Sequence, residues 1–152
     1  AVLMTQAATE FITPLTLQVL SQRLVGLDIM QEPDPSKVNH INIAKETDLF
    51  LLAPATANTI AKLANGLADN MVTATALALP IQTKKILAPA MNTQMYENPI
   101  TQQNIDRLKL TGWKTIEPRE AILACGDQGK GALAEIDTII DTVKELIYEK
   151  TV

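Results

Sequence analysis

Short apolar runs alternate along the chain with longer stretches of helical periodicity. The runs cover residues 1–4, 49–53 and 86–88 and, more weakly, residues 113–116. Their hydrophobicity is continuous rather than alternating, which indicates strands that are covered on both faces. The pattern therefore predicts an α/β fold, with an open parallel sheet between two layers of helices.

Helices are expected at residues 7–20, 58–79, 99–111 and 137–150. The second stretch is interrupted near Asn65 and Gly66, where a glycine stop followed by an Asp start is typical of an ordinary helix break. Residues 30–39 carry two prolines and several charges, so we expect a loop that leads to His40. The fourth helix has its apolar side chains on one stripe, which is typical of core packing.

Composition narrows the class of protein. The chain has 152 residues, 47% of them apolar, which is enough to bury one sizeable core, so we expect a single domain over residues 1–152. A formal net charge of -4 argues against nucleic acid and anionic lipid as partners. No run approaches the roughly 20 apolar residues of a membrane span, and a single cysteine cannot form an internal disulfide. We therefore expect a soluble, reduced, cytoplasmic protein.

Polar or turn-forming residues follow three of the predicted strands. Thr5 follows the first strand, residues 54–56 the second and residues 89–92 the third. The carboxyl ends of parallel strands lie along one edge of a sheet, where ligands of this architecture bind. We therefore expect one shared rim, formed by Thr5, Thr56, Asn58 and Asn92. Helix capping alone is the plain alternative for Thr56 or Asn58, and a helix N-terminus also favours an anion or an electron-rich ring edge.

The start of the chain departs from the usual order of a doubly wound nucleotide-binding fold. Such a fold opens with a strand, a glycine-rich turn and a helix, whereas residues 1–4 already form a complete strand. We expect that the first β-α unit is absent from this chain and lies upstream. The alternative is a chain with impaired phosphate binding.

The most informative stretch is residues 89–96, called the clamp segment below, which places an amide between two thioethers. Methionines at the spacing of Met91 and Met95 are usually core residues. Asn92 is costlier to bury, because its amide carries two donors and an acceptor that need partners, and a ligand carboxylate is a good match.

The flap segment, residues 124–131, holds the lone thiol. Three glycines follow Cys125 within six residues, so we predict a mobile, tightly turning loop with a reactive thiol, although free cysteines are mostly buried and inert. A phosphate cradle is the alternative, but the loop lacks the Lys-Ser/Thr ending of a P-loop.

His40 is the only histidine and, taken alone, is more often structural than catalytic. One His and one Cys without clustered carboxylates do not make a zinc site, so no metal is expected. A cysteine or serine hydrolase is also a poor match, because no His lies near Cys125 in the sequence.

Four ordered motifs resemble those of the homo-oligomeric, flavin-dependent cysteine decarboxylases, over nearly all of the chain. They are His40, residues 54–59, the clamp segment, and the Ala-Cys-Gly-Asp run at residues 124–127. The resemblance implies a flavodoxin-like (Rossmann-type) fold, bound FMN, and assembly as a trimer or a dodecamer of trimers. It also implies conversion of 4'-phospho-N-pantothenoylcysteine to 4'-phosphopantetheine in coenzyme A biosynthesis, and a partnership with phosphopantothenate-cysteine ligase.

The resemblance also implies roles for individual residues. His40 would act in the oxidative half of the reaction, as a base or by orienting the substrate thiol, and Cys125 would donate a proton later. Asn92 would take the substrate carboxylate. The remaining substrate contacts would be Met91, Met95, Tyr96 and Ala124, where the family often has Trp in place of Tyr96. The flavin contacts would be Thr5, Phe11, Pro54, Thr56, Asn58, Asp69, Asn70 and Pro89.

Competing interpretations keep the flavin but change the function. A peptidyl-cysteine decarboxylase typically lacks the flap cysteine, and a flavin prenyltransferase lacks both the clamp and the Ala-Cys-Gly-Asp run. A non-catalytic regulatory subunit usually carries long acidic tails and loses catalytic residues. A plain flavin electron carrier needs no thiol on a flap. Cys125 therefore argues against the peptidyl-cysteine decarboxylase and the electron carrier. The clamp and the Ala-Cys-Gly-Asp run argue against the prenyltransferase, and the retained catalytic residues argue against the regulatory subunit.

Overall fold

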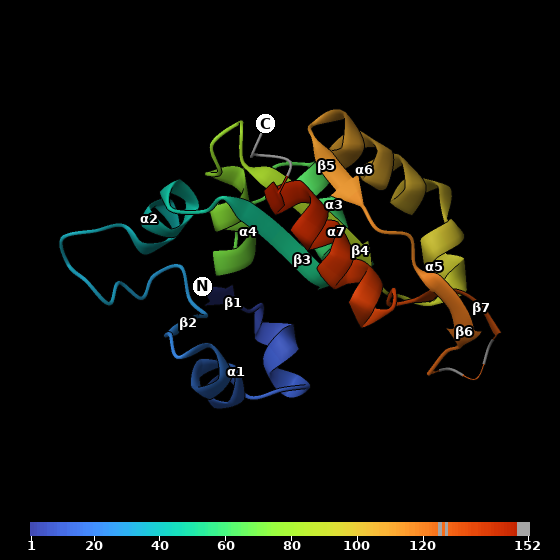
Figure 1. Ribbon diagram of the computed structural model, residues 1–152, viewed down its shortest axis with the longest axis horizontal. Helices are drawn as coiled ribbons and strands as arrows, with labels where there is room; N and C mark the ends of the chain where they lie inside the picture. The colour runs from blue at the N-terminus through green and yellow to red at the C-terminus, as the bar shows by residue number, and fades with distance from the viewer. Residues whose placement is uncertain (125, 127, 149–152) are drawn as a thin grey trace. The chain divides into compact units, whose positions relative to one another are not determined.

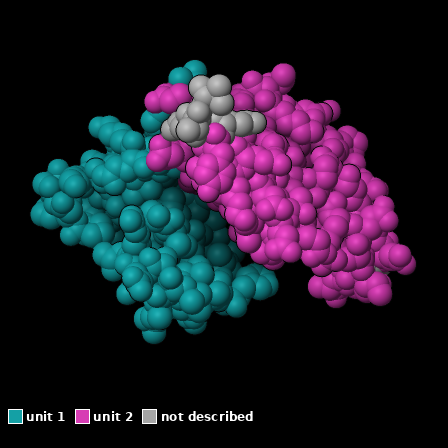
Figure 2. All heavy atoms as spheres, in the orientation of Figure 1, with its two compact units in different colours: residues 1–47, 66–81 teal, residues 48–65, 82–152 magenta. Residues whose placement is uncertain are grey.

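The computed structural model describes residues 1–124, 126 and 128–148, and the chain divides into two compact units (Figure 2). The first unit consists of residues 1–47 and 66–81. The second consists of residues 48–65 and 82–152.

The second unit is built on a three-stranded parallel sheet in the order β3-β4-β5 (Figure 1). Its strands are β3 (Leu49–Ala55), β4 (Lys84–Pro89) and β5 (Trp113–Thr115), at the positions predicted from the apolar runs. Ile86 and Ala88 join one buried cluster, while Leu87 points to the opposite face and is also fully buried. Both faces of β4 are therefore covered, which explains why its hydrophobicity is continuous rather than alternating.

The described part of the second unit also contains four helices. They are α3 (Ala57–Ala64), α5 (Thr93–Glu97), α6 (Pro99–Leu110) and α7 (Ile136–Tyr148). Helix α7 crosses one face of the sheet, where Ile139 joins the cluster with Ile86 and Ala88 (Figure 1). Helix α6 packs against α3 and β5. The helices predicted at residues 99–111 and 137–150 are confirmed over the described residues.

A hairpin of β6 (Arg119–Ile122) and β7 (Gln128–Ala132) completes the second unit. The prediction of a loop throughout the flap segment is therefore wrong for residues 128–131, which lie in β7. Glycine is depleted in strands, so a strand that contains Gly129 and Gly131 has no propensity signal. Cys125 and Asp127 lie outside the described residues.

The first unit pairs two short parallel strands, β1 (Val2–Leu3) and β2 (Val25–Gly26). Around them lie the 3-10 helix η1 (Gln6–Glu10) and the helices α1 (Pro14–Ser21), α2 (Asn39–Lys45) and α4 (Met71–Leu77). The side chains of Leu3 and Met71 fill the space that a Cβ at Gly26 would occupy. This close packing gives the unit its own small core.

One sequence prediction for the first unit needs correction, and two of its elements were not predicted. The single helix expected at residues 7–20 is two helices, because Thr13 caps α1 and Pro14 begins it. Strand β2 was not predicted, since two residues carry no periodicity. The loop expected before His40 is confirmed up to Val38, but helix α2, which begins at Asn39 and carries His40, was not predicted.

The break expected within residues 58–79 is confirmed. Helix α3 ends at Ala64, Gly66 has a φ of 69°, and α4 begins at Met71. The residue that caps α4 is Asn70, through a capping box with Thr73, rather than Asp69. No helix in the described part of the chain has the length and apolar character that crossing a membrane requires.

The central strand of the sheet makes a stability prediction. We expect Ile86→Ala to lower the free energy of unfolding by about 2–5 kcal/mol, because it leaves a cavity at a fully buried site. The matched control is Ile100→Ala on α6, where the side chain is 68% exposed and the expected loss is below about 1 kcal/mol. Urea unfolding curves measure both. Equal losses in the two variants would contradict this account of the core.

Candidate functional site

The parallel pairing of β3 and β4 places their carboxyl ends at one edge of the sheet. Ala55 is paired with Pro89 across the two strands, and the Ala90 N–H donates to the Ala55 carbonyl at 3.0 Å. The chain then leaves both strands at the same edge. The rim expected from the sequence is therefore confirmed for Thr56 and for the residues that follow Pro89.

Thr56 begins α3 at this edge. Its Oγ1 accepts the Thr59 N–H at 3.3 Å, so Thr56 is the helix cap, as the plain alternative predicted. Asn58 is exposed in the first turn of α3, and Pro54 is exposed near the end of β3. The edge therefore presents an amide and the N-terminus of a helix, which are suited to an electron-rich ring edge.

The clamp segment turns from β4 into the short helix α5. Asn92 is half-buried and caps α5, with its Oδ1 accepting the Gln94 N–H at 2.9 Å. Met91 is half-buried and Met95 is 50% exposed, so Met95 is not a core residue. Pro89 is buried at the end of β4. The structure thus brings Thr56, Pro89 and Asn92 together in the second unit.

Tyr96 is only 6% exposed and belongs to a cluster that sequence reasoning missed. Its hydroxyl donates to Glu117 Oε2 at 2.9 Å, and Lys130 Nζ donates to the same oxygen at 2.7 Å. The Lys130 ammonium also lies 5.5 Å from the centroid of the Tyr96 ring, which is a cation–π distance. No local sequence signal links these residues, because 21 and 13 positions separate Glu117 from Tyr96 and Lys130.

The environment of this cluster shifts two pKa values. Burial, with the hydrogen bond to Glu117, raises the pKa of Tyr96 to about 12. The hydrogen bond from Lys130 lowers the pKa of Glu117 below its ordinary value of 4.5. At neutral pH the cluster therefore holds an ionised Glu117 and a protonated Tyr96.

Strand β7 packs directly on the clamp segment through its glycines. The Met91 N–H donates to the Gly131 carbonyl at 2.9 Å, and a Cβ at Gly131 would overlap the Met91 carbonyl oxygen. A Cβ at Gly129 would lie 2.5 Å from Thr93 Oγ1. These two glycines therefore let the β7 backbone approach the clamp segment closely, a role that the prediction of a mobile loop did not include. Ala124 is exposed in a turn before β7.

Apart from Cys125, which lies outside the described residues, the remaining predicted site residues lie in the first unit. His40 is half-buried, and its Nδ1 is buried without a hydrogen-bond partner among the described residues. A buried ring nitrogen in this state suits a hydrogen bond from a ligand. Helix α2, which carries His40, packs against α4, which Asn70 caps; the Asn70 amide donates to Asp69 Oδ1 at 3.1 Å.

Thr5 and Phe11 flank η1 in the same unit. Thr5 is its N-cap, with Oγ1 accepting the Ala8 N–H at 3.3 Å, and Phe11 is exposed at its other end. The prediction that Thr5 shares a rim with Thr56 and Asn92 stays a prediction. Among the described residues, no group of three or more His, Cys, Asp or Glu side chains could hold a metal ion.

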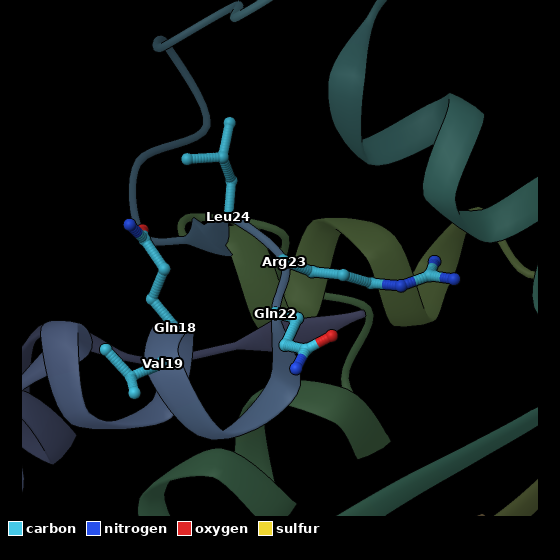
Figure 3. Close-up of a pocket in the computed structure, with 5 residues that line it drawn as sticks. All are labelled: Gln18, Val19, Gln22, Arg23 and Leu24. Carbon is cyan, nitrogen blue, oxygen red and sulfur yellow. The ribbon is translucent and has the colours of Figure 1, made fainter.

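The first unit also carries a surface hollow of about 430 Å³ (Figure 3). Its lining comes from the last turns of α1 and the segment that follows, and consists of Gln18, Val19, Gln22, Arg23 and Leu24. None of the predicted site residues lines it. The hollow is therefore distinct from the candidate site.

The chain belongs to the flavoprotein family, whose model, described as Flavoprotein, matches residues 1–148. It is 62% identical over 144 residues to a probable phosphopantothenoylcysteine decarboxylase of Streptococcus mutans, covering 95% of this chain and 80% of that protein. It is 45% identical over 150 residues to the coenzyme A biosynthesis bifunctional protein CoaBC of Bacillus subtilis. That match covers 99% of this chain and 36% of the bifunctional protein.

Solved structures show the same fold. A PPC decarboxylase variant complexed with pantothenoylaminoethenethiol has a TM-score of 0.83 at 33% identity, covering 97% of this chain and 81% of that one. The FMN binding protein AtHal3 has a TM-score of 0.81 at 34% identity, covering 99% and 82%. The predicted flavodoxin-like fold class and the resemblance to flavin-dependent cysteine decarboxylases are thus confirmed.

The Tyr96 cluster predicts a pH dependence of stability. Because the pKa of Glu117 is lowered in the folded protein, the cluster stabilises the fold above about pH 4.5 and loses this contribution as the pH falls through the folded pKa. The carboxylate is partly exposed, so we expect a contribution of about 1 kcal/mol or less. Urea unfolding at several pH values should show that the wild type loses its advantage over Glu117→Gln under acidic conditions. A constant difference between the two would contradict the assignment.

Proposed function

We propose that this chain catalyses the FMN-dependent oxidative decarboxylation of 4'-phospho-N-pantothenoylcysteine to 4'-phosphopantetheine. The observation that carries the proposal is the placement of the Asn92 clamp beside the end of β3, at the ligand-binding edge of the sheet. The relatives named phosphopantothenoylcysteine decarboxylase and coenzyme A biosynthesis protein support the same activity.

The donor set of the chain fits a flavin. The edge of the second unit offers the Asn58 amide and the first turn of α3, flanked by Pro54, Thr56 and Pro89. In the first unit we assign flavin contacts to Thr5, Phe11, Asp69 and Asn70. The buried Nδ1 of His40 lacks a protein partner within the described residues, as expected of a group that meets a ligand.

Decarboxylation of this substrate needs an electron sink. The cysteine carboxylate lies next to an amide nitrogen, so direct loss of carbon dioxide would leave an unstabilised carbanion. When bound, the flavin supplies a two-electron oxidation of the cysteine side chain and the matching reduction afterwards. Loss of a hydride from the β-carbon and of the thiol proton gives a thioaldehyde, which takes up the electron pair as the bond to carbon dioxide breaks. Return of a hydride and of two protons, one to carbon and one to sulfur, gives the thiol product with no net oxidation.

Residues of this chain bind the substrate carboxylate and transfer the protons of the reaction. We assign the substrate carboxylate to Asn92, whose side-chain amide carries N–H donors suited to it and whose oxygen caps α5. The His40 imidazole takes the thiol proton or orients the thiol. Cys125, in the flap segment, donates the proton of the reductive half. Met91, Met95, Tyr96 and Ala124 remain the proposed surroundings of the substrate.

Assembly and partners belong to the same proposal. We place the chain in a homo-oligomer built from trimers, as a trimer or a dodecamer of trimers, in the cytoplasm. The bifunctional relatives are much longer than this chain, which supports a functional link with the ligase that makes the substrate, phosphopantothenate-cysteine ligase.

The test is incubation of the full-length protein and FMN with 4'-phospho-N-pantothenoylcysteine, with carbon dioxide and product mass measured. We expect His40→Asn and Asn92→Gln to lower carbon dioxide release by about a hundredfold or more. Cys125→Ser should still release carbon dioxide, but should accumulate an oxidised product that is two hydrogens lighter than 4'-phosphopantetheine.

The matched control is Asn104→Gln on α6, which makes the same chemical change as Asn92→Gln away from the edge and should leave the rate unchanged. A peptide with a C-terminal cysteine tests the peptidyl-cysteine alternative. The proposal fails if the wild type releases no carbon dioxide from 4'-phospho-N-pantothenoylcysteine, or if Cys125→Ser forms the fully reduced product at the wild-type rate.

A further inference from the structure

The cluster of Tyr96, Glu117 and Lys130 joins three separate parts of the second unit. Tyr96 lies on α5, Lys130 lies on β7, and Glu117 lies in the connection between β5 and β6. The position of Glu117 is fixed by its neighbours. The Ile116 N–H donates to the Leu87 carbonyl at 2.8 Å, and both Ile116 and Pro118 are buried. The carboxylate is therefore attached to the sheet, while its two donors come from the clamp and from β7.

Each of the three groups contacts the other two. One carboxylate oxygen of Glu117 accepts both the Tyr96 hydroxyl and the Lys130 ammonium, and the ammonium also lies over the Tyr96 ring. Removing any one side chain therefore breaks two contacts. A closed arrangement of this kind holds its members more firmly than an isolated surface ion pair.

The same strand also contacts the other end of the clamp segment. Gly131 accepts the Met91 N–H, and Gly129 packs against Thr93 without space for a Cβ. Strand β7 thus holds Met91 and Thr93 through its backbone and Tyr96 through Lys130. Asn92 lies between these contacts, and its side chain already caps α5.

We propose that Tyr96, Glu117 and Lys130 are positioning residues, which hold β7 against the clamp segment and so fix the position of the Asn92 amide. This inference rests on the proposed function. It changes the expected role of Tyr96 from substrate contact to positioning residue. The Tyr96 hydroxyl is bonded to Glu117 and its ring lies beneath the Lys130 ammonium, so the side chain acts mainly through these neighbours. A displacement of about 1 Å at such a support can lower a rate by about a hundredfold.

The test compares Tyr96→Phe, Glu117→Gln and Lys130→Met in the full-length protein with FMN. Two quantities are measured with 4'-phospho-N-pantothenoylcysteine: the KM for carbon dioxide release, and the ratio of oxidised to fully reduced product. We expect Glu117→Gln and Lys130→Met each to raise both quantities on the order of tenfold, with a smaller rise for Tyr96→Phe, which keeps the ring. The double variant Glu117→Gln/Lys130→Met should raise the KM and the product ratio little further than either single variant, because the two residues belong to one cluster.

The matched control is Lys114→Met. Lys114 also pairs with a carboxylate, that of Glu145 at 3.8 Å, and its side chain is 47% exposed compared with 39% for Lys130. It should leave the KM and the product ratio at wild-type values. If the cluster served only the stability of the fold, its loss would lower the fraction of active enzyme. Such a loss changes neither the KM nor the product ratio.

The outcomes separate the two proposals. If the wild type releases no carbon dioxide, the proposed function fails. If the wild type is active and the three variants keep the wild-type KM and product ratio, the positioning role alone is overturned.

Discussion

The hydrogen bond from Ala90 to Ala55 marks the constraint on which the candidate site depends. It continues the parallel pairing of β3 and β4 to their carboxyl ends, so the chain leaves both strands at one edge. The fully buried side chains of β4 hold this register, because a shift by one residue would turn Ile86 out of its cluster. The sheet thereby sets the distance between the first turn of α3 and the Asn92 clamp.

A second constraint ties the flap to the same edge. Strand β7 approaches the clamp closely enough that Gly129 and Gly131 leave no space for a Cβ. The charge cluster around Glu117 adds a contact at the far end of the clamp. Glycines in the flap segment therefore have two separate uses: Gly126, with a φ of 87°, turns the chain, and Gly129 and Gly131 leave room for the clamp segment.

The parts of the fold that could be predicted are those with a local signal. The buried strands of the second unit have continuous apolar runs, and the capping residues Thr56 and Asn92 are polar residues that directly precede helices. The two-residue strand β2 and the glycine-containing strand β7 have no such signal. The helix around His40 was missed because the prolines before it favoured a loop that continued to that residue.

The candidate site was predicted from the resemblance of its motifs to a known family. The resemblance of the motifs, and not periodicity, supplied the flavin, the substrate and the roles of His40 and Cys125. The relatives' names agree with the predicted activity and cofactor. Glu117 and Lys130 could not be found in this way, because their contacts with Tyr96 depend on how β7 packs on α5 in three dimensions.

The central claim is that the clamp edge holds the carboxylate of the substrate. The most direct measurement is a crystal structure of the full-length protein with FMN and an unreactive substrate analogue that keeps the carboxylate. The account predicts that the Asn92 amide donates to that carboxylate, with β7 still packed on the clamp. A carboxylate bound away from residues 89–96 would contradict it.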